Sequence, residues 1–138
     1  AVSVASRDDY QIRASSSGEL RVEDSAIRAF PLDAIRRESA RAVAASAMTR
    51  LSERGVDGVW IHFDVDALDS TLMPAVDSPE PGGLTADEAV ELLDALVAHP
   101  LARGLQVTIY DPDRDPDGVA AIVLVDVLVR GLASRARR

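Results

Sequence analysis

Three aspartates at the end of an apolar run are the residues of this sequence best suited to carry chemistry. The run Trp-Ile-His-Phe at residues 60–63 is followed by Asp64, Asp66 and Asp69. On a β-strand, Asp64 and Asp66 would face the same side about 7 Å apart, where two negative charges repel by roughly 2 kcal/mol. A divalent cation between them removes this repulsion, and carboxylate oxygens suit a hard ion such as Mn²⁺ or Mg²⁺. The spacing therefore predicts a metal site; the alternative is hydrated acids where a strand ends in solvent.

A second group of acids fills residues 111–118, with the sequence Asp-Pro-Asp-Arg-Asp-Pro-Asp-Gly. Its last part matches the opening of a calcium-binding loop, but Leu124 stands where that loop needs Glu. Acids just before a helix complement its positive N-terminal end. We assign most of the group to that role and keep Asp111 as the one acid with a possible function. His62 could hydrogen-bond Asp64 from outside a metal site, or be a satisfied core histidine.

The elements that position these acids follow from periodicity and from turn residues. Short apolar runs predict strands at residues 2–5, 26–30, 59–65 and 104–110. Helical periodicity predicts helices at residues 32–54, from Thr85 onward and at 119–132. Thr85 begins a capping box with Glu88, and residues 15–18 read as a flexible loop.

Three of these elements carry a specific expectation about burial or continuity. The strand at 59–65 is apolar on both faces, as buried parallel strands are. The helix at 119–132 is strongly apolar and is expected to be largely buried. Ser39 interrupts the apolar line of the helix at 32–54, and we expect the helix to tolerate it.

Strands and helices alternate along the chain, which predicts a mainly parallel sheet with helices on its faces. Ligands of such sheets bind beyond the carboxyl ends of the strands. Asp64, Asp66 and Asp69 follow one strand and Asp111 follows another, so chemistry is expected there. The length of 138 residues predicts a single α/β domain over residues 1–138.

Composition and charge exclude several classes of protein. The net charge of −8 argues against a nucleic-acid partner, because phosphate binding needs a basic surface. The absence of cysteine excludes disulfides, thiolate metal sites and a cysteine nucleophile, and is compatible with the cytoplasm, where we expect the protein. We expect no membrane association, because no apolar stretch reaches spanning length. The chain begins at Ala1 inside an apolar segment, which is expected of a chain cut from a longer protein and equally of one that has lost its initiator methionine.

The acid pair also fits, less well, the pattern of haloacid-dehalogenase-like phosphatases, Asp-x-Asp-x-Thr after an apolar strand. Leu68 occupies the position of the threonine, and the sequence contains no lysine to supply that family's later basic residue. An EF-hand loop beginning at Asp64 fails because Asp69 stands where glycine is needed. The phosphatase remains an alternative, as does a non-catalytic α/β domain with a weak acidic cation site.

Two longer segments resemble the ureohydrolase family of arginases and agmatinases. Residues 62–69 read His-Phe-Asp-Val-Asp-Ala-Leu-Asp, and residues 74–85 form a proline-rich loop that ends in Gly-Gly-Leu-Thr. Residues 107–112 are similar to that family's last active-site strand and turn. The resemblance implies an arginase-like, three-layer α/β/α fold with a mainly parallel sheet, here truncated at its N-terminus.

The resemblance also implies a reaction and its cofactor. Two Mn²⁺ ions would hold a bridging hydroxide that attacks a guanidino or amidino carbon, with Asp64 bridging both metals and Asp66 binding one. Asp69 would orient the loop. Arginases bind substrate with a glutamate at the position of Ile109, so Asp111, on the same side, would be the substitute substrate-binding acid.

The family's two upstream metal motifs, Gly-Gly-Asp-His and Asp-Ala-His-x-Asp, do not occur in this sequence. We therefore expect this chain alone to be inactive, with at most a partial metal site. We also expect it to form homo-oligomers or to associate with a missing N-terminal half, since a truncated sheet exposes apolar faces and edges.

Overall fold

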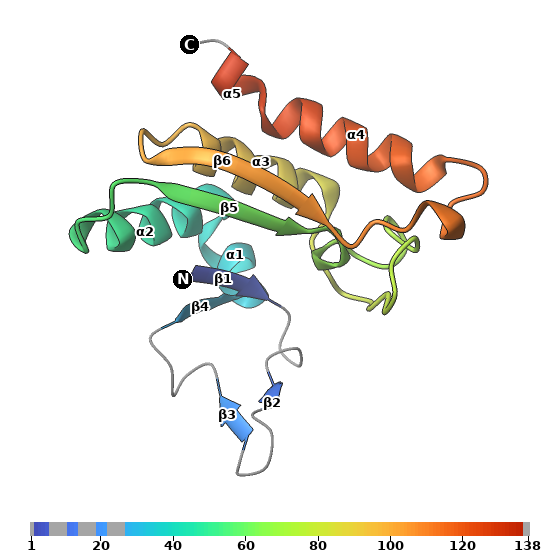
Figure 1. Cartoon of the computed structure of the whole chain (residues 1–138), viewed down its shortest axis with the longest axis horizontal. Helices are drawn as coiled ribbons and strands as arrows, with labels where there is room; N and C mark the ends of the chain where they lie inside the picture. The colour runs from blue at the N-terminus through green and yellow to red at the C-terminus, as the bar shows by residue number, and fades with distance from the viewer. Residues whose placement is uncertain (1, 6–10, 14–18, 22–26, 137–138) are drawn as a thin grey trace.

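The computed structural model describes residues 2–5, 11–13, 19–21 and 27–136, with side-chain surroundings described for 27–135. The predicted loop at 15–18 lies outside these residues. Within these described residues, six strands form three pairs (Figure 1). Strand β1 (Val2–Ala5) pairs in parallel with β4 (Arg28–Pro31), β2 (Gln11–Arg13) pairs antiparallel with β3 (Glu19–Arg21), and β5 (Val59–Asp64) pairs in parallel with β6 (Ala102–Thr108). The parallel strands β5 and β6 are connected through a helix, which confirms the predicted α/β class.

The predicted helix at 32–54 is two helices, so the expectation that it tolerates Ser39 was wrong. Helix α1 (Leu32–Glu38) ends at Ser39, and α2 (Ala40–Glu53) begins directly after it. Ser39 has φ 92°, and its side chain accepts a hydrogen bond from the N–H of Ala42 at 3.2 Å. A serine hydroxyl that caps a new helix competes with helix continuation, which periodicity alone does not reveal.

The helix expected from Thr85 onward is α3 (Ala86–Val97), and its capping box is present. The side chain of Thr85 accepts from the N–H of Glu88 at 3.2 Å, and the Glu88 carboxylate accepts from the N–H of Thr85 at 2.8 Å. Two short 3₁₀ turns, η2 (Val65–Ala67) and η3 (Pro112–Arg114), follow β5 and β6. Among the described residues, no helix is long and apolar enough to cross a membrane.

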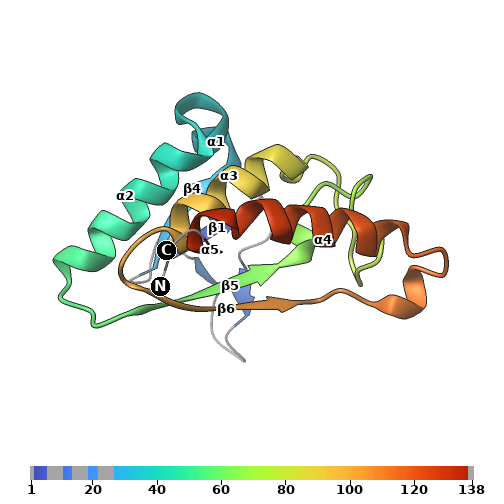
Figure 2. The ribbon, with the colours of Figure 1, turned by 90° about the horizontal axis from the view of Figure 1, so that it is seen from above.

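Strand β5 has one buried and one exposed face, so the expectation of burial on both faces was wrong. Ile61 and Phe63 lie in the core, whereas the side chain of Trp60 is 63% exposed and His62 is also exposed. Seen from above, helices α2, α3 and α4 lie on one side of the β5–β6 pair (Figure 2). The described helices therefore cover one face of this pair and leave Trp60, His62 and Asp64 on the other.

Helix α4 (Val119–Gly131) occupies the predicted position, but the expectation of overall burial was wrong. Leu124 and Val127 are buried, and Gly131 lies so close to α3 that an added Cβ would come within 2.9 Å of Leu93. The opposite side is an apolar stripe of four residues that are 57–69% exposed: Val119, Ile122, Val125 and Val129. A short helix, α5 (Ala133–Ala136), follows.

Candidate metal site at the end of β5

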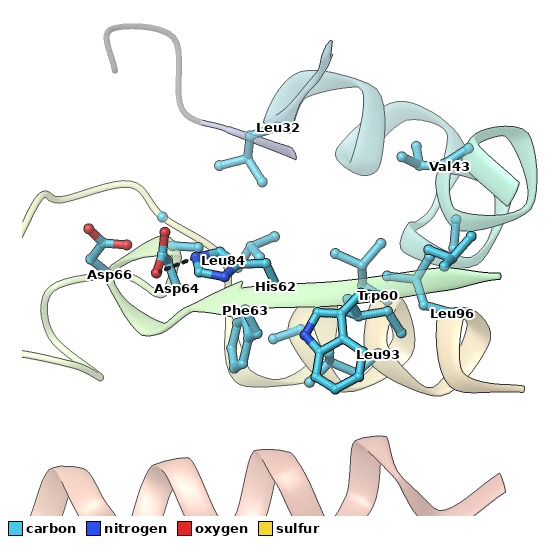
Figure 3. A pocket seen from close by; sticks show the side chains of 18 of the residues that line it. Leu32, Val43, Trp60, His62, Phe63, Asp64, Asp66, Leu84, Leu93 and Leu96 are labelled. Carbon is cyan, nitrogen blue, oxygen red and sulfur yellow. Dashed lines mark hydrogen bonds and ion pairs between the residues drawn. The ribbon is translucent and has the colours of Figure 1, made fainter. Parts of the chain in front are cut away.

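Asp64 and Asp66 lie together at the carboxyl end of β5, although not both on the strand. Asp64 is the last residue of β5, and Asp66 lies in η2, so the expected strand spacing between them was wrong. Both carboxylates point to the same side (Figure 3), and both line a cavity of about 680 Å³. The 3₁₀ turn therefore brings the two carboxylates to one site by a different route from the one predicted.

The Asp64 carboxylate is held by two neighbours on the exposed face of the β5–β6 pair. His62 Nε2 lies 3.0 Å from Asp64 Oδ1 (Figure 3), and the hydroxyl of Thr108 on β6 donates to the same oxygen. Both hydrogen bonds fall on Oδ1, and within the described residues no hydrogen bond to Oδ2 is found. The hydrogen bond to Asp64 considered for His62 is therefore present, and the core alternative was wrong, since the His62 side chain is 50% exposed.

Thr108 was not predicted as a site residue. It lies directly opposite Asp64 because β5 and β6 pair in the register Asp64–Thr108. Period-two alternation places Trp60, His62 and Asp64 on one face from sequence alone. The cross-strand partner depends on the register, for which the two strand sequences carry no signal.

The cavity beside Asp64 is bounded by apolar side chains from several elements. Leu32 of α1, Val43 of α2 and Leu93 of α3 line it, and β5 contributes one edge (Figure 3). Asp64 and Asp66 lie at the end of this cavity where β5 meets the loop. A low-dielectric wall beside two carboxylates strengthens their attraction for a cation compared with carboxylates in open water.

Asp69 organises the loop of residues 70–83, as predicted. Its Oδ1 accepts from the N–H and the hydroxyl of Thr71 at 2.9 and 2.6 Å, and its Oδ2 accepts from the N–H of Gly82 at 2.7 Å. These bonds hold the pKa of Asp69 below its ordinary value: the Thr71 hydroxyl contributes most, then the two N–H groups, against a smaller upward effect of burial. A carboxylate that accepts three hydrogen bonds stays ionised, and here it links the beginning of the loop to its end.

A backbone bridge closes the same loop at its base. Leu68 and Leu84 pair in parallel, with the N–H of Asp69 donating to Leu84 O at 3.0 Å and the N–H of Leu84 donating to Ala67 O at 2.8 Å. A Cβ on Gly83 would come within 2.6 Å of the Asp69 backbone nitrogen, so only glycine fits. The loop is therefore fixed relative to η2 and Asp66.

Asp111 does not reach the candidate metal site as a free acid. Its Oδ1 accepts from the N–H of Asp113 at 3.0 Å, and its Oδ2 accepts from Arg114 Nε at 3.1 Å. It is not among the residues that line the cavity beside Asp64. The substrate-binding role expected for Asp111 stays a prediction, and this geometry does not favour it because Arg114 already occupies the carboxylate.

Two of the remaining acids of residues 111–118, Asp115 and Asp117, accept from the first N–H groups of α4, as predicted for most of this group. Asp115 accepts from the N–H groups of Ala120 and Ala121 at 3.0 and 2.8 Å and from the Tyr110 hydroxyl at 2.9 Å. Burial is the largest influence on the pKa of Asp115 and raises it, but these donors together outweigh burial and lower the pKa. The hydrogen bond to Asp115 also raises the pKa of Tyr110.

The donor set fits part of a divalent cation site. Asp64 and Asp66 supply hard oxygen ligands at one end of a cavity, and Asp64 Oδ2 accepts no bond from the described residues. No group of three or more His, Cys, Asp or Glu side chains that could hold a metal occurs within the described part of the chain. These two residues would therefore supply two ligands and would not by themselves complete a site.

Comparisons with known proteins agree on one family. The model of the Arginase family matches residues 10–133. The mitochondrial arginase of Medicago truncatula is 40% identical over 82 residues, which cover 59% of this chain and 23% of that protein. The N(1)-aminopropylagmatine ureohydrolase of Thermus thermophilus is 33% identical over 97 residues, which cover 63% of this chain and 33% of that enzyme.

A solved structure shares the fold. Trypanosoma cruzi formiminoglutamase, crystallised with Mn²⁺, has a TM-score of 0.69 and 24% identity over 85% of this chain and 39% of its own. At this identity the likeness shows the fold, which is the arginase-like α/β fold that the sequence predicted. In all three comparisons this chain spans less than half of the relative's length.

Proposed function

The chain belongs to the arginase family, and from this premise we propose that it carries one part of a manganese-dependent ureohydrolase site. The reaction would be hydrolysis of a guanidino or amidino C–N bond. The observation that carries the proposal is the pair Asp64 and Asp66, which line one cavity at the carboxyl end of β5. Carboxylate oxygens are ligands that Mn²⁺ accepts, and relatives in this family act on guanidino substrates.

Each residue of the site has a separate task in this proposal. Asp64 and Asp66 bind the cation, and Asp69 fixes the loop beside them through Thr71 and Gly82. Bound Mn²⁺ would supply Lewis-acid chemistry and lower the pKa of water that attacks the substrate carbon. Apolar side chains line the cavity on one side of the site.

We further propose that the chain alone is inactive, because two ligands do not hold a cation pair. The described residues offer no third His, Cys, Asp or Glu to this site. Further ligands would come from polypeptide that carries the family's upstream motifs. The comparison with longer relatives supports this division, since the matched segment covers 23% of the Medicago arginase.

The same reasoning supports association with another polypeptide. The apolar stripe of α4 is exposed, and Trp60 is exposed on the uncovered face of β5. Burying these side chains would be favourable by roughly 25 cal/mol per Å². The proposed partners are a second copy of this chain or the polypeptide that supplies the missing ligands.

The proposal is tested by titrating the purified chain with Mn²⁺ and following binding by calorimetry and by the loss of the free-ion EPR signal. We expect weak binding that Asp64→Asn and Asp66→Asn each abolish. Asp77→Asn is the matched control, because the Asp77 side chain is 82% exposed and does not line the cavity that Asp64 and Asp66 line. Binding that persists in both site variants would refute the metal site.

Activity is tested by urea or amine release from arginine, agmatine and formiminoglutamate, first with the chain alone. We then expect release when the chain is expressed together with its upstream coding region, provided that region encodes Gly-Gly-Asp-His and Asp-Ala-His-x-Asp. Two tightly held Mn²⁺ ions and urea release from the isolated chain would contradict the proposed inactivity. Phosphate-monoester hydrolysis that Asp64→Asn abolishes would instead favour the phosphatase alternative, for which the family match gives no support.

A further inference from the structure

A continuous line of hydrogen bonds crosses the exposed face of the β5–β6 pair and ends on Asp64. The register places His62 opposite Gln106 and Asp64 opposite Thr108. Trp60 Nε1 lies 3.1 Å from Gln106 Oε1, Gln106 Nε2 lies 2.5 Å from His62 Nδ1, and His62 Nε2 lies 3.0 Å from Asp64 Oδ1. Four side chains from two strands are thus linked from an indole to a carboxylate.

The chemistry of each group fixes the direction of every bond in this line. An indole N–H only donates, so the atom of Gln106 that faces Trp60 must be the amide oxygen. The other end of the amide is then the NH₂ group, which only donates, so His62 Nδ1 must accept from it. The neutral imidazole therefore carries its proton on Nε2, which donates to Asp64.

The position of Trp60 is itself fixed by the opposite strand. Its indole lies over Gly104, and a Cβ at position 104 would overlap the ring. Glycine at this point therefore lets the ring lie flat enough for Nε1 to meet Gln106. The line begins at a residue whose place is set by backbone packing, although its side chain is 63% exposed.

We propose that Trp60 and Gln106 are positioning residues that hold His62 as its Nε2–H tautomer and so fix the orientation of Asp64. With His62 and Thr108 both donating to Oδ1, the carboxylate cannot rotate without losing two bonds. Oδ2 is then the oxygen presented to a cation. The statement that Asp64 binds a cation rests on the proposed function, whereas the hydrogen-bonded line does not.

The test is the tautomer of His62 in the metal-free chain, read from long-range ¹H–¹⁵N correlation spectra near pH 8.5, where an ordinary imidazole is neutral. The chain has two histidines. His99 is the internal control, because its Nδ1 accepts from the N–H of Leu101 at 3.2 Å, far along the chain from the line. We expect the Nε2–H pattern for His62 in the unaltered chain.

Gln106→Glu keeps the shape of the side chain and replaces the amide NH₂ donor by a second acceptor oxygen. A carboxylate only accepts, so His62 Nδ1 must carry a proton to keep this bond, and the pattern of a bare Nδ1 beside Nε2–H should be lost, while the shifts of His99 stay. Trp60→Phe removes the indole N–H, frees the amide of Gln106 to turn over and should give a mixture of both tautomers. Three-bond couplings at Asp64 should report one side-chain rotamer in the unaltered chain and averaging in both variants.

An Nδ1–H tautomer in the unaltered chain overturns the proposal. So does a His62 pattern, or an Asp64 rotamer, that neither variant changes. Both variants are on an exposed strand face, and unchanged backbone amide spectra away from residues 60–64 and 104–108 show that each is folded. Failure of Mn²⁺ binding would refute the proposed function and leave the hydrogen-bonded line intact, so the two failures are distinguishable.

Discussion

The carboxylate of Asp69 accepts a hydrogen bond from the backbone N–H of Gly82 at 2.7 Å, across 13 residues of chain. This bond joins the end of η2 to the far end of the proline-rich loop. Together with the Leu68–Leu84 bridge, this bond holds the two ends of the loop together beside Asp66. The loop buries Met73 and Val76 completely, so its conformation is part of the core.

The hydrogen bonds from Thr71 to Asp69 predict that Thr71 stabilises the fold to a degree that depends on pH. The folded-state pKa of Asp69 is depressed, chiefly by the Thr71 hydroxyl. This stabilisation is present above the carboxyl's unfolded pKa and is lost as pH falls through the folded pKa. Thr71→Val should lower the urea midpoint at pH 7 and flatten its decline on acidification, whereas Thr71→Ser should restore both. Identical midpoints for the Val and Ser variants from pH 7 to pH 3 would contradict this role.

Gly83→Ala should be among the most damaging single substitutions in the loop. Its Cβ would lie 2.6 Å from the carbonyl carbon of Leu68, which is backbone and cannot move aside. We expect a loss of roughly 3 kcal/mol in the free energy of unfolding. Gly58→Ala is the matched control, because its Cβ meets the flexible side chain of Arg103 and should change stability by about 1 kcal/mol or less. Equal losses of unfolding free energy in the two variants, measured by urea unfolding, would contradict the prediction, because the loop would then accommodate the added Cβ.

Ser39→Gly should stabilise the chain. The φ of 92° and ψ of 152° at Ser39 lie in a region that costs a side chain of order 1–3 kcal/mol, and glycine avoids this cost. Replacing a serine cap by glycine loses only about a few tenths of a kcal/mol. The thermal midpoint should therefore rise. Ser39→Ala keeps the strain, loses the bond to Ala42 and should lower the midpoint; a higher midpoint for Ala than for Gly would refute the strained junction.

The apolar stripe of α4 should govern self-association. Val125 is 58% exposed, so Val125→Glu adds charge without disturbing the buried side of the helix. We expect light scattering to show oligomers of the unaltered chain and at least a tenfold higher dissociation constant for the variant, about 1.4 kcal/mol of association energy. Ser52→Glu on the exposed side of α2 is the control and should leave the mass unchanged. A monomeric unaltered chain would remove the basis for self-association.

Several elements could be predicted because their causes are local. The capping box of Thr85 and Glu88 lies within one turn, so α3 begins where the sequence predicts. The acids before α4 were likewise assigned to its N-terminus, and Asp115 lies there. The junction at Ser39 was missed because the same residue type is compatible with a helix face and with a cap, and φ decides between them.

The exposure of whole faces of helices and strands could not be predicted, because an apolar composition does not reveal which face packs against another element. Val125 and Leu124 are neighbours in one apolar helix, yet one is exposed and the other is buried against the core. The same holds in β5, where Trp60 is exposed and Ile61 is not. Burial depends on which other helices and strands pack against a face, and that is decided only in the folded chain.

By itself, the sequence determined the α/β class, the family, and the pair Asp64 and Asp66 as the acids most suited to a cation, because strand and helix periodicity and short motifs are encoded within a few residues. Only the tertiary structure decided how those acids are held. Gln106 and Thr108 lie more than forty positions from His62 and Asp64, and the register of two parallel strands brings them into contact. Register is fixed by packing of both strands on the helices beneath them, so the orientation of Asp64 belongs to the fold and not to the motif.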